Sequence, residues 1–254
     1  MLKFLTDLSL FYEDEGYYYP TTKGTMTIYG IAALAIIIAF VLIFIAVKKR
    51  AVAGSAATAA AGAAAPAKSN PVFSSTKQMV ICALLLALGF VTSMFGPKMP
   101  WGGRVTLFSM LFISYIGYLY GLKVGIFAAL TYSILQFMQD PYVLTPLQVC
   151  LDYFFAFTAL GLSGLFANMK KNGLLIGYIV AVLGRFFFAT LAGYIYWSDP
   201  AYIPESFPKA LTFLYSPLYN LAYIGPEMAV TIAILCIPAV KKVLEDRLKK
   251  ASLD

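Results

Sequence analysis

Long apolar runs separated by short breaks dominate the chain. A helix needs about 20 predominantly apolar residues to cross roughly 30 Å of hydrocarbon, and several runs reach or approach that length. Glycine and proline interrupt the runs, for example at Gly96, Pro97, Pro141 and Pro217. The pattern predicts an all-α membrane protein with seven transmembrane helices. The predicted spans are residues 28–47, 76–95, 105–120, 123–138, 146–166, 174–197 and 218–240.

The composition supports a membrane protein. Hydrophobic residues make up 61% of the 254 residues, charged residues only 12%, and the mean hydropathy is +0.79. A soluble domain carries about 25% charged residues. A large soluble protein would also need polar faces on its buried helices, and these runs lack them.

The chain divides into four predicted parts. Residues 1–27 are polar and aromatic and form an N-terminal segment that we expect outside the cell. Residues 28–47 form an extra anchor, and a cytoplasmic linker follows at 48–75, most of it rich in alanine, glycine and serine. Residues 76–254 then form a membrane domain of six helices.

Lysine and arginine are distributed asymmetrically between the predicted loops. If the basic cluster after the anchor is cytoplasmic, 13 of the 19 lysines and arginines lie inside, 5 lie outside and Arg185 falls within a span. The positive-inside rule favours this orientation. We therefore expect a multi-pass protein of the bacterial cell membrane with an extracellular N-terminus and a cytoplasmic C-terminus. The net charge of +7 is explained in this way and does not indicate nucleic acid.

Several chemistries are disfavoured by what the sequence lacks. There is no histidine, so zinc sites with His ligands, Ser-His-Asp arrangements and His proton relays are ruled out. The three cysteines, Cys82, Cys150 and Cys236, lie in apolar segments without metal-ligand spacing. We expect no enzymatic activity, no cofactor and no metal site.

Three charged residues fall inside predicted spans: Asp152, Arg185 and Glu227. Such residues are costly in a bilayer and indicate functional sites by default. Asp152 lies six residues below the outer end of its helix, roughly 9 Å deep, where it either holds a cation in an external cavity or is a structural acid near the interface. Arg185 and Glu227 lie at similar depths, and we expect them to pair with each other.

Aromatic and small residues allow two interpretations each. Trp101, Tyr153, Trp197, Tyr215 and Tyr219 map to the outer ends of spans. They form either an interfacial aromatic belt or, in part, a cage for an organic cation. Alanines at positions 83 and 87 have the spacing that allows close helix approach in lipid, although alanine is common in such helices.

Ordered motifs give the chain a family resemblance over residues 76–240. The motifs are MPWGG at 99–103 with SM at 109–110, PLQVCLDY at 146–153 with ALGLSGLF at 159–166, GYIYWS at 193–198, and YSPLYN at 215–220 with PE at 226–227. Together they resemble the thiamine-specific S components of energy-coupling-factor (ECF) vitamin transporters. The anchor and the linker lie outside the resemblance.

The resemblance implies a fold, a ligand and partners. It implies a six-helix bundle with a thiamine pocket that opens outward beneath the first extracellular loop. It also implies a transmembrane coupling protein (T component) and two cytoplasmic ATPases, which supply the energy, because this chain has no GxxxxGK[ST] phosphate loop. Ala83 and Ala87 would lie on the helix that docks against the coupling protein. The implied ligand-binding residues are Asp152, Tyr153, Trp197, Tyr215, Asn220 and Trp101.

One position departs from the family pattern and keeps alternatives open. Family members often carry a histidine eight residues before the aromatic residue that ends the fifth helix, and here that position is Ala189. The ligand is therefore thiamine or a related precursor. A stand-alone, ion-coupled secondary transporter is a further alternative, and an intramembrane enzyme is disfavoured by the missing histidines.

Overall fold

The computed structural model describes residues 11–14, 17–20, 27, 72–73, 75–99, 103–169, 171–197 and 203–248. The chain divides into two compact units, Met1–Pro71 and Val72–Asp254. The predicted anchor at 28–47 and nearly all of the predicted linker at 48–75 lie outside the described residues, so both stay predictions.

The first unit contains a β-hairpin that the sequence analysis missed. Strands β1 (Phe11–Asp14) and β2 (Tyr17–Pro20) pair antiparallel, with Phe11 opposite Pro20 and Asp14 opposite Tyr17. Their residues, FYED and YYYP, are rich in aromatic side chains, which favour strands.

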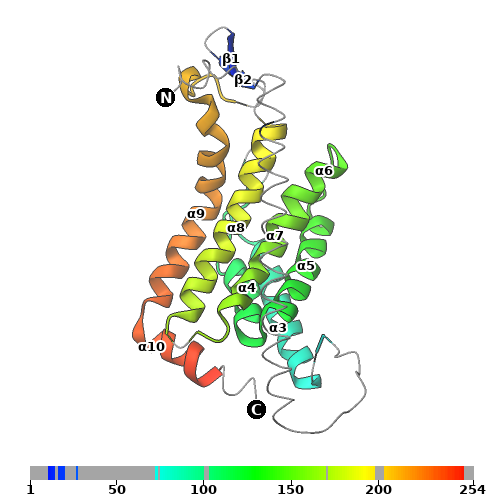
Figure 1. Cartoon of the computed structure of the whole chain (residues 1–254), viewed down its shortest axis with the longest axis vertical. Helices are drawn as coiled ribbons and strands as arrows, with labels where there is room; N and C mark the ends of the chain where they lie inside the picture. Colours follow the sequence, from blue (N-terminus) through cyan, green and yellow to red (C-terminus); the bar gives the residue numbers. More distant parts are fainter. Residues whose placement is uncertain are drawn as a thin grey trace. The chain divides into compact units, whose positions relative to one another are not determined.

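The second unit is a bundle of six principal helices within the described residues (Figure 1). The fourth of them, Pro146–Phe166, is continuous but changes its winding along its length. The bundle confirms a helix in each of the six predicted spans of this region, and five of these helices are long enough to cross a membrane. The principal elements are α3 (Thr76–Met94), α4 (Ser109–Tyr120), α5 (Leu122–Gln139), the series α6 (Pro146–Val149), η1 (Cys150–Phe155), α7 (Ala156–Thr158) and η2 (Ala159–Phe166), then α8 (Gly173–Tyr196) and α9 (Tyr215–Leu235).

Three predicted boundaries differ from the structure by three residues or more: both ends of the last span and the start of the second. The last helix was expected to begin after Pro217, but that proline lies in the first turn of α9, where a missing N–H costs little. The helix ends before Pro238, which begins the short helix α10 (Pro238–Lys241). The second span was expected to begin at Val105, but residues 103–105 pair with residues 97–99: the Val105 amide donates to the Pro97 carbonyl at 3.0 Å, and the Met99 amide to the Gly103 carbonyl at 3.0 Å.

Helix α4 is short and lies at the centre of the bundle. It has 12 residues, nine of them buried, and it packs against α3, α5, α8 and η2. At 1.5 Å per residue it rises only about 18 Å, less than the thickness of the hydrocarbon core. Five other helices among the described residues are long and apolar enough to cross a membrane. The bundle therefore surrounds a core helix that stops short of one end.

A seam of glycines brings the central helices together. A side chain on Gly161 would place its Cβ 2.6 Å from the backbone of Gly125, and one on Gly125 would lie 2.6 Å from the Cα of Gly117. Small residues allow such approach between helices in lipid. Ala83 and Ala87, the small residues that the sequence analysis singled out, are exposed on α3 and lie outside this seam.

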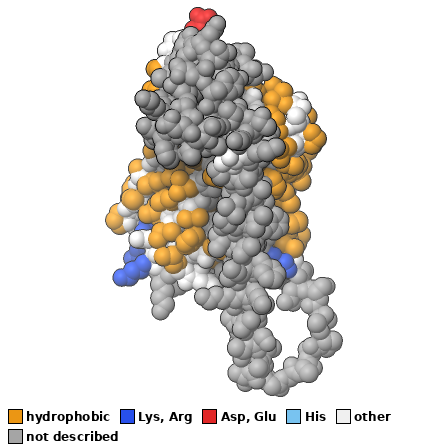
Figure 2. Space-filling view, turned by 45° about the horizontal axis from the view of Figure 1, so that its top comes forward, with side chains coloured by type: hydrophobic (Ala, Val, Ile, Leu, Met, Phe, Trp, Pro, Cys, Tyr) orange, Lys and Arg blue, Asp and Glu red, His pale blue; other side chains and the backbone are white. Residues whose placement is uncertain are grey.

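The outer face of the bundle suits a lipid environment. Figure 2 shows hydrophobic side chains over the visible flanks of the helices. On α3, Leu84 is 59% exposed and Leu88 48% exposed. Exposed apolar surface of this extent is unusual in a soluble monomer but expected in a bilayer. With five helices able to cross a membrane, the chain is a multi-pass membrane protein.

We predict that Gly161→Ala strongly destabilises the bundle. The new methyl group meets backbone atoms that cannot rotate away, so overpacking should lower the free energy of unfolding by about 1–3 kcal/mol. The apparent melting temperature in detergent, followed by helical circular dichroism, measures the effect. Gly225→Ala is the matched control, because its methyl group meets only the flexible Leu221 side chain, at 3.2 Å. Equal stability of the two variants would contradict a close-packed seam.

Candidate functional site

A cavity of about 470 Å³ lies at the end of the bundle where α4 begins. Its wall is formed by the last turn of α3, the loop that follows it, the C-terminal parts of α5 and α8, and the N-terminal parts of the fourth principal helix and of α9. Because α4 is short, its first residue, Ser109, lines this cavity. The volume is within the range of small-molecule sites.

Five of the six predicted ligand-binding residues line this one cavity. They come from three helices that are far apart in the sequence, and Trp101, the sixth, lies outside the described residues. Sequence periodicity alone could not separate an aromatic belt from a cage; the geometry places these residues around a common space. Their role in binding stays a prediction. The five residues are Asp152, Tyr153, Trp197, Tyr215 and Asn220.

Asp152 is held in place by a glutamine that the sequence analysis did not single out. The Gln148 amide nitrogen donates to Asp152 Oδ2 at 2.7 Å, and its carbonyl oxygen accepts from the Leu144 amide at 3.1 Å. The Gln148 side chain is 1% exposed. The backbone amide of Gln148 donates to the Thr145 hydroxyl at 3.1 Å, which caps the start of the helix. The four-residue spacing of Gln148 and Asp152 is a helical contact spacing, so this partner could have been anticipated.

The helix widens where Asp152 and Tyr153 face the cavity. Cys150–Phe155 is a π-helical turn, a feature that often marks functional sites. Tyr153 packs edge-on against Phe137, with ring centroids 5.2 Å apart, and its hydroxyl donates to the Asp140 carbonyl at 2.7 Å. Tyr153 is therefore fixed at both its ring and its hydroxyl.

Three further tyrosines complete the wall: Tyr142 and Tyr223, which the sequence analysis did not name, and Tyr219, which it named only as part of an aromatic belt or cage. Tyr142 lies beside Trp197, with ring centroids 5.3 Å apart. Tyr219 lies between Tyr215 and Tyr223, at centroid distances of 5.9 and 6.0 Å. The four-residue spacing of these three tyrosines along α9 was a readable signal, because it puts them on one helix face.

Asn220 is buried and already has two hydrogen bonds. The Tyr223 hydroxyl donates to its Oδ1 at 2.7 Å, and its Nδ2 donates to the Ser216 carbonyl at 2.9 Å. A side-chain amide has two donors and two acceptor sites. Among the described residues, these two bonds leave one N–H and one lone pair of the Asn220 amide unused.

The predicted ion pair of Arg185 with Glu227 was wrong. The Glu227 carboxylate, 1% exposed, accepts hydrogen bonds from the Thr106 hydroxyl, from the Ser109 hydroxyl at 3.2 Å and from the Met110 amide at 2.7 Å. It caps the N-terminus of α4, where a carboxylate is favoured. Similar depth in the membrane did not reveal which way each side chain faces.

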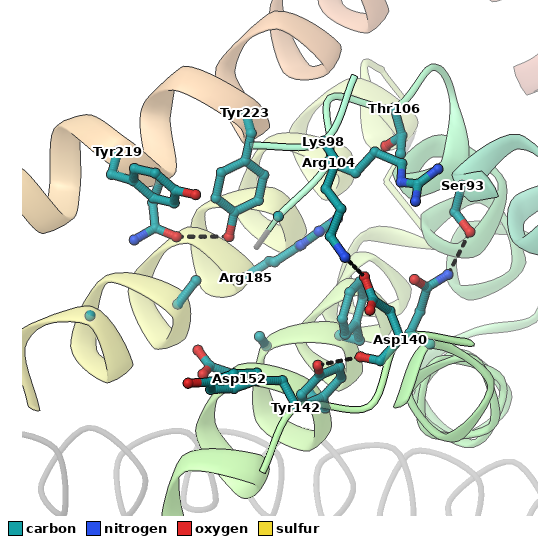
Figure 3. A pocket seen from close by; sticks show the side chains of 18 of the residues that line it. Ser93, Lys98, Arg104, Thr106, Asp140, Tyr142, Asp152, Arg185, Tyr219 and Tyr223 are labelled. Carbon is teal, nitrogen blue, oxygen red and sulfur yellow. Dashed lines mark hydrogen bonds and ion pairs between the residues drawn. The ribbon is translucent and has the colours of Figure 1, made fainter. Parts of the chain in front are cut away.

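Arg185 turns toward the cavity instead. Its guanidinium lies 4.3 Å from the centroid of the Phe157 ring, and both residues line the cavity. Figure 3 shows Arg185 and Asp152 on different walls of the same space. Sequence analysis had placed Arg185 in a structural role outside the site.

An ion pair joins two loops at the rim of the cavity. Lys98 Nζ lies 2.5 Å from Asp140 Oδ2, and both side chains are about half exposed (Figure 3). Arg104, also in the loop after α3, donates to the Met94 carbonyl. The loop is thereby tied both to its own helix and to the end of α5.

These features define a membrane protein with a polar, aromatic-walled cavity at one end of a helical bundle. Residues 79–245 match the family described as thiamine transporter protein, and the chain belongs to that family.

Two relatives accompany this match. The chain is 28% identical over 171 residues to the thiamine transporter ThiT of Bacillus subtilis (strain 168), covering 62% of this chain and 85% of that protein. A solved structure of ThiT from Listeria monocytogenes is 20% identical, covers 64% of this chain and 96% of that one, and superposes with a TM-score of 0.49.

We predict that Glu227→Gln destabilises the protein more than it weakens ligand binding. The variant replaces a carboxylate oxygen that accepts hydrogen bonds by an NH₂ group that cannot accept them, which should cost about 1–3 kcal/mol of unfolding free energy. Thermal unfolding in detergent measures the loss. Glu205→Gln, at an exposed acid in the loop before α9, is the control. A variant as stable as the parent would contradict the capping role of Glu227.

Proposed function

We propose that the chain captures thiamine in this cavity as the S component of an ECF-type importer. The observation that carries the proposal is that the Asp152 carboxylate and aromatic rings from three helices line a single cavity. Membership of the thiamine transporter family supports the choice of ligand. The protein binds and delivers the vitamin without changing it chemically.

The chemistry of the wall suits the vitamin. Thiamine carries a permanently charged thiazolium ring and an aminopyrimidine ring. Asp152 balances the charge or accepts from the amino group, and Trp197 and Tyr215 offer ring faces for stacking and cation–π contact. The free N–H and lone pair of Asn220 match the donor and acceptor edge of the pyrimidine.

The loop after α3 acts as the cap of the cavity in this proposal. Lys98, Gly103 and Arg104 of this loop line the cavity, and Trp101 lies in the same loop. The ion pair of Lys98 with Asp140 holds the loop against the end of α5. The cavity opens to the outside of the cell when the N-terminus of the chain is extracellular and its C-terminus cytoplasmic, as the charge distribution predicts.

Energy comes from partner proteins in this proposal. The T component docks on α3, where Ala83 and Ala87 are exposed next to the large apolar side chain of Leu84. Small residues on an exposed apolar face allow close approach of a second membrane helix. Two cytoplasmic ATPases then drive the release of thiamine into the cell.

We predict that Asp152→Asn and Trp197→Ala each weaken thiamine binding at least 10-fold, or about 1.4 kcal/mol. The first removes the charge that balances the thiazolium, and the second removes a stacking surface, so Trp197→Phe should bind better than Trp197→Ala. Isothermal titration calorimetry with purified protein measures the affinities. Glu205→Gln is the control for the loss of an acid elsewhere. Binding equal to that of the parent in both main variants would show that the site lies elsewhere.

We predict that Ala83→Leu and Ala87→Leu abolish uptake but leave thiamine binding unchanged. A bulky side chain blocks close helix approach without touching the cavity. Uptake of labelled thiamine is compared in cells that express the coupling protein and ATPases, with Ala222→Leu on the exposed face of α9 as the matched control. Uptake that continues without the ATPases and stops when the proton gradient collapses would instead support a secondary transporter.

A further inference from the structure

The chain turns after its last long helix and continues at the end of the bundle away from the cavity. Helix α9 ends at Leu235, and the extended residue Ile237 separates it from α10 and the helical turn η5 (Lys242–Leu248). Figure 1 shows α10 and the residues after it turning away from the direction of α9 at the bottom of the bundle. Since Leu211–Leu235 is long and apolar enough to cross a membrane, the segment that follows it begins at the level of the lipid headgroups.

One face of this segment is attached to the bundle. The Tyr115 hydroxyl of α4 donates to the Leu244 carbonyl at 2.8 Å, and the Leu174 amide of α8 donates to Glu245 Oε1 at 3.2 Å. The Leu244 side chain also packs against the hydrophobic core. These contacts fix which face of the segment is turned toward the bundle and which is turned away from it.

Apolar side chains are exposed on the outward face. Ile237 is 46% exposed and Val243 is 44% exposed, and Met169, in the loop before α8, is exposed as well. Helical segments that lie in the membrane interface place apolar side chains at the boundary between headgroups and acyl chains. The exposed side chains at the end of a span therefore suit contact with lipid better than contact with water.

Two exposed lysines flank the contact between this segment and the loop before α8. Lys241 donates to Asn172 Oδ1, and the next residue on each side, Lys242 and Lys171, is exposed. Neither Lys171 nor Lys242 forms an ion pair with a described residue. In the sequence, residues 169–172 and 238–248 together carry five lysines or arginines and two acids. The local charge is therefore positive, which is complementary to a phosphate group.

We propose that Lys171, Lys242, Ile237 and Val243 form a surface that binds an anionic phospholipid. Basic side chains at a membrane surface attract anionic headgroups, and the two apolar side chains lie where the acyl chains begin. A soluble anion would use the lysines and leave Ile237 and Val243 in water, whereas an anionic lipid satisfies both kinds of side chain. Because the same segment is bonded to α4 and α8, a bound lipid stabilises the bundle as a whole.

The first test uses the unaltered full-length protein in a neutral detergent. Phosphatidylglycerol or phosphatidylcholine with identical acyl chains is added to the micelles, and helical circular dichroism follows the apparent melting temperature. We expect phosphatidylglycerol to raise the melting temperature at a mole fraction about fivefold lower or less. Equal effects of the two lipids would overturn the proposal. Glycerol 3-phosphate, which lacks acyl chains, should have no effect, and stabilisation equal to that by phosphatidylglycerol would show a site for a soluble anion instead.

The second test assigns the lipid preference to the two lysines. The double variant Lys171→Gln/Lys242→Gln should need about fivefold more phosphatidylglycerol, or more, for the same stabilisation. The matched control Lys77→Gln/Lys123→Gln removes the same charge from exposed positions at the starts of α3 and α5, at the same end of the bundle, and should keep the preference. Equal losses in both double variants would overturn the proposal, because they would show a general effect of charge.

A protein partner on this surface would give a different result. The double variant Lys171→Gln/Lys242→Gln would then keep the preference for phosphatidylglycerol but lose assembly with the coupling protein, which would overturn the proposal and assign the surface to that partner. If this variant does not fold, the comparison of the two lipids on the unaltered protein decides.

Discussion

The buried carboxylate of Glu227 connects the last principal helix of the bundle to the second. It accepts hydrogen bonds from Thr106, Ser109 and the Met110 amide at the N-terminus of α4, and two of these residues, Thr106 and Ser109, also line the cavity. The floor of the cavity is therefore fixed by a contact between segments more than 100 residues apart. A displaced α4 would either fill the cavity or leave helix amides unsatisfied, which is costly in a membrane.

At the opposite end of the bundle, a glutamate from a distant part of the chain again accepts a hydrogen bond from the N-terminus of a helix. The Leu174 amide near the start of α8 donates to Glu245 Oε1 at 3.2 Å, and Glu245 belongs to the helical turn η5 (Lys242–Leu248). The Tyr115 hydroxyl of α4 donates to the Leu244 carbonyl of the same turn at 2.8 Å. Both α4 and α8 follow a residue in the left-handed region, Phe108 or Asn172, without a local side-chain cap. Distant glutamates supply the missing acceptors, so the C-terminal part of the chain completes helices that begin much earlier.

Hydrophobic patterns predicted the helices well and their environments poorly. The bounds of Pro146–Phe166 were predicted from its apolar run and flanking proline. Pro217 was taken as a break before the last helix, because the sequence does not show whether a proline ends a helix or lies in its first turn. Helix α9 therefore begins earlier than expected, at Tyr215. The second span was started at Val105 instead of Ser109 because the hydrogen bonds that hold residues 103–105 against residues 97–99 involve backbone groups, which leave no signal in the sequence. The hairpin had a readable signal in its aromatic strands, separated by Glu15 and Gly16.

In the candidate site, residue type alone does not show which side chains face the cavity. Five cavity residues were named through family motifs, because depth and periodicity do not distinguish a side chain that faces lipid from one that faces a cavity. Arg185 and Glu227 have similar depths and different surroundings: the first lies against a phenyl ring beside the cavity with no ion pair to a described residue, and the second accepts hydrogen bonds at a helix terminus. Whether a charged side chain points toward the cavity or toward another helix depends on how its own helix is rotated in the bundle. That rotation is set by packing around the short helix α4. A cavity that places an acid and a guanidinium on different walls constrains how a charged ligand is oriented, and not only how tightly it is held.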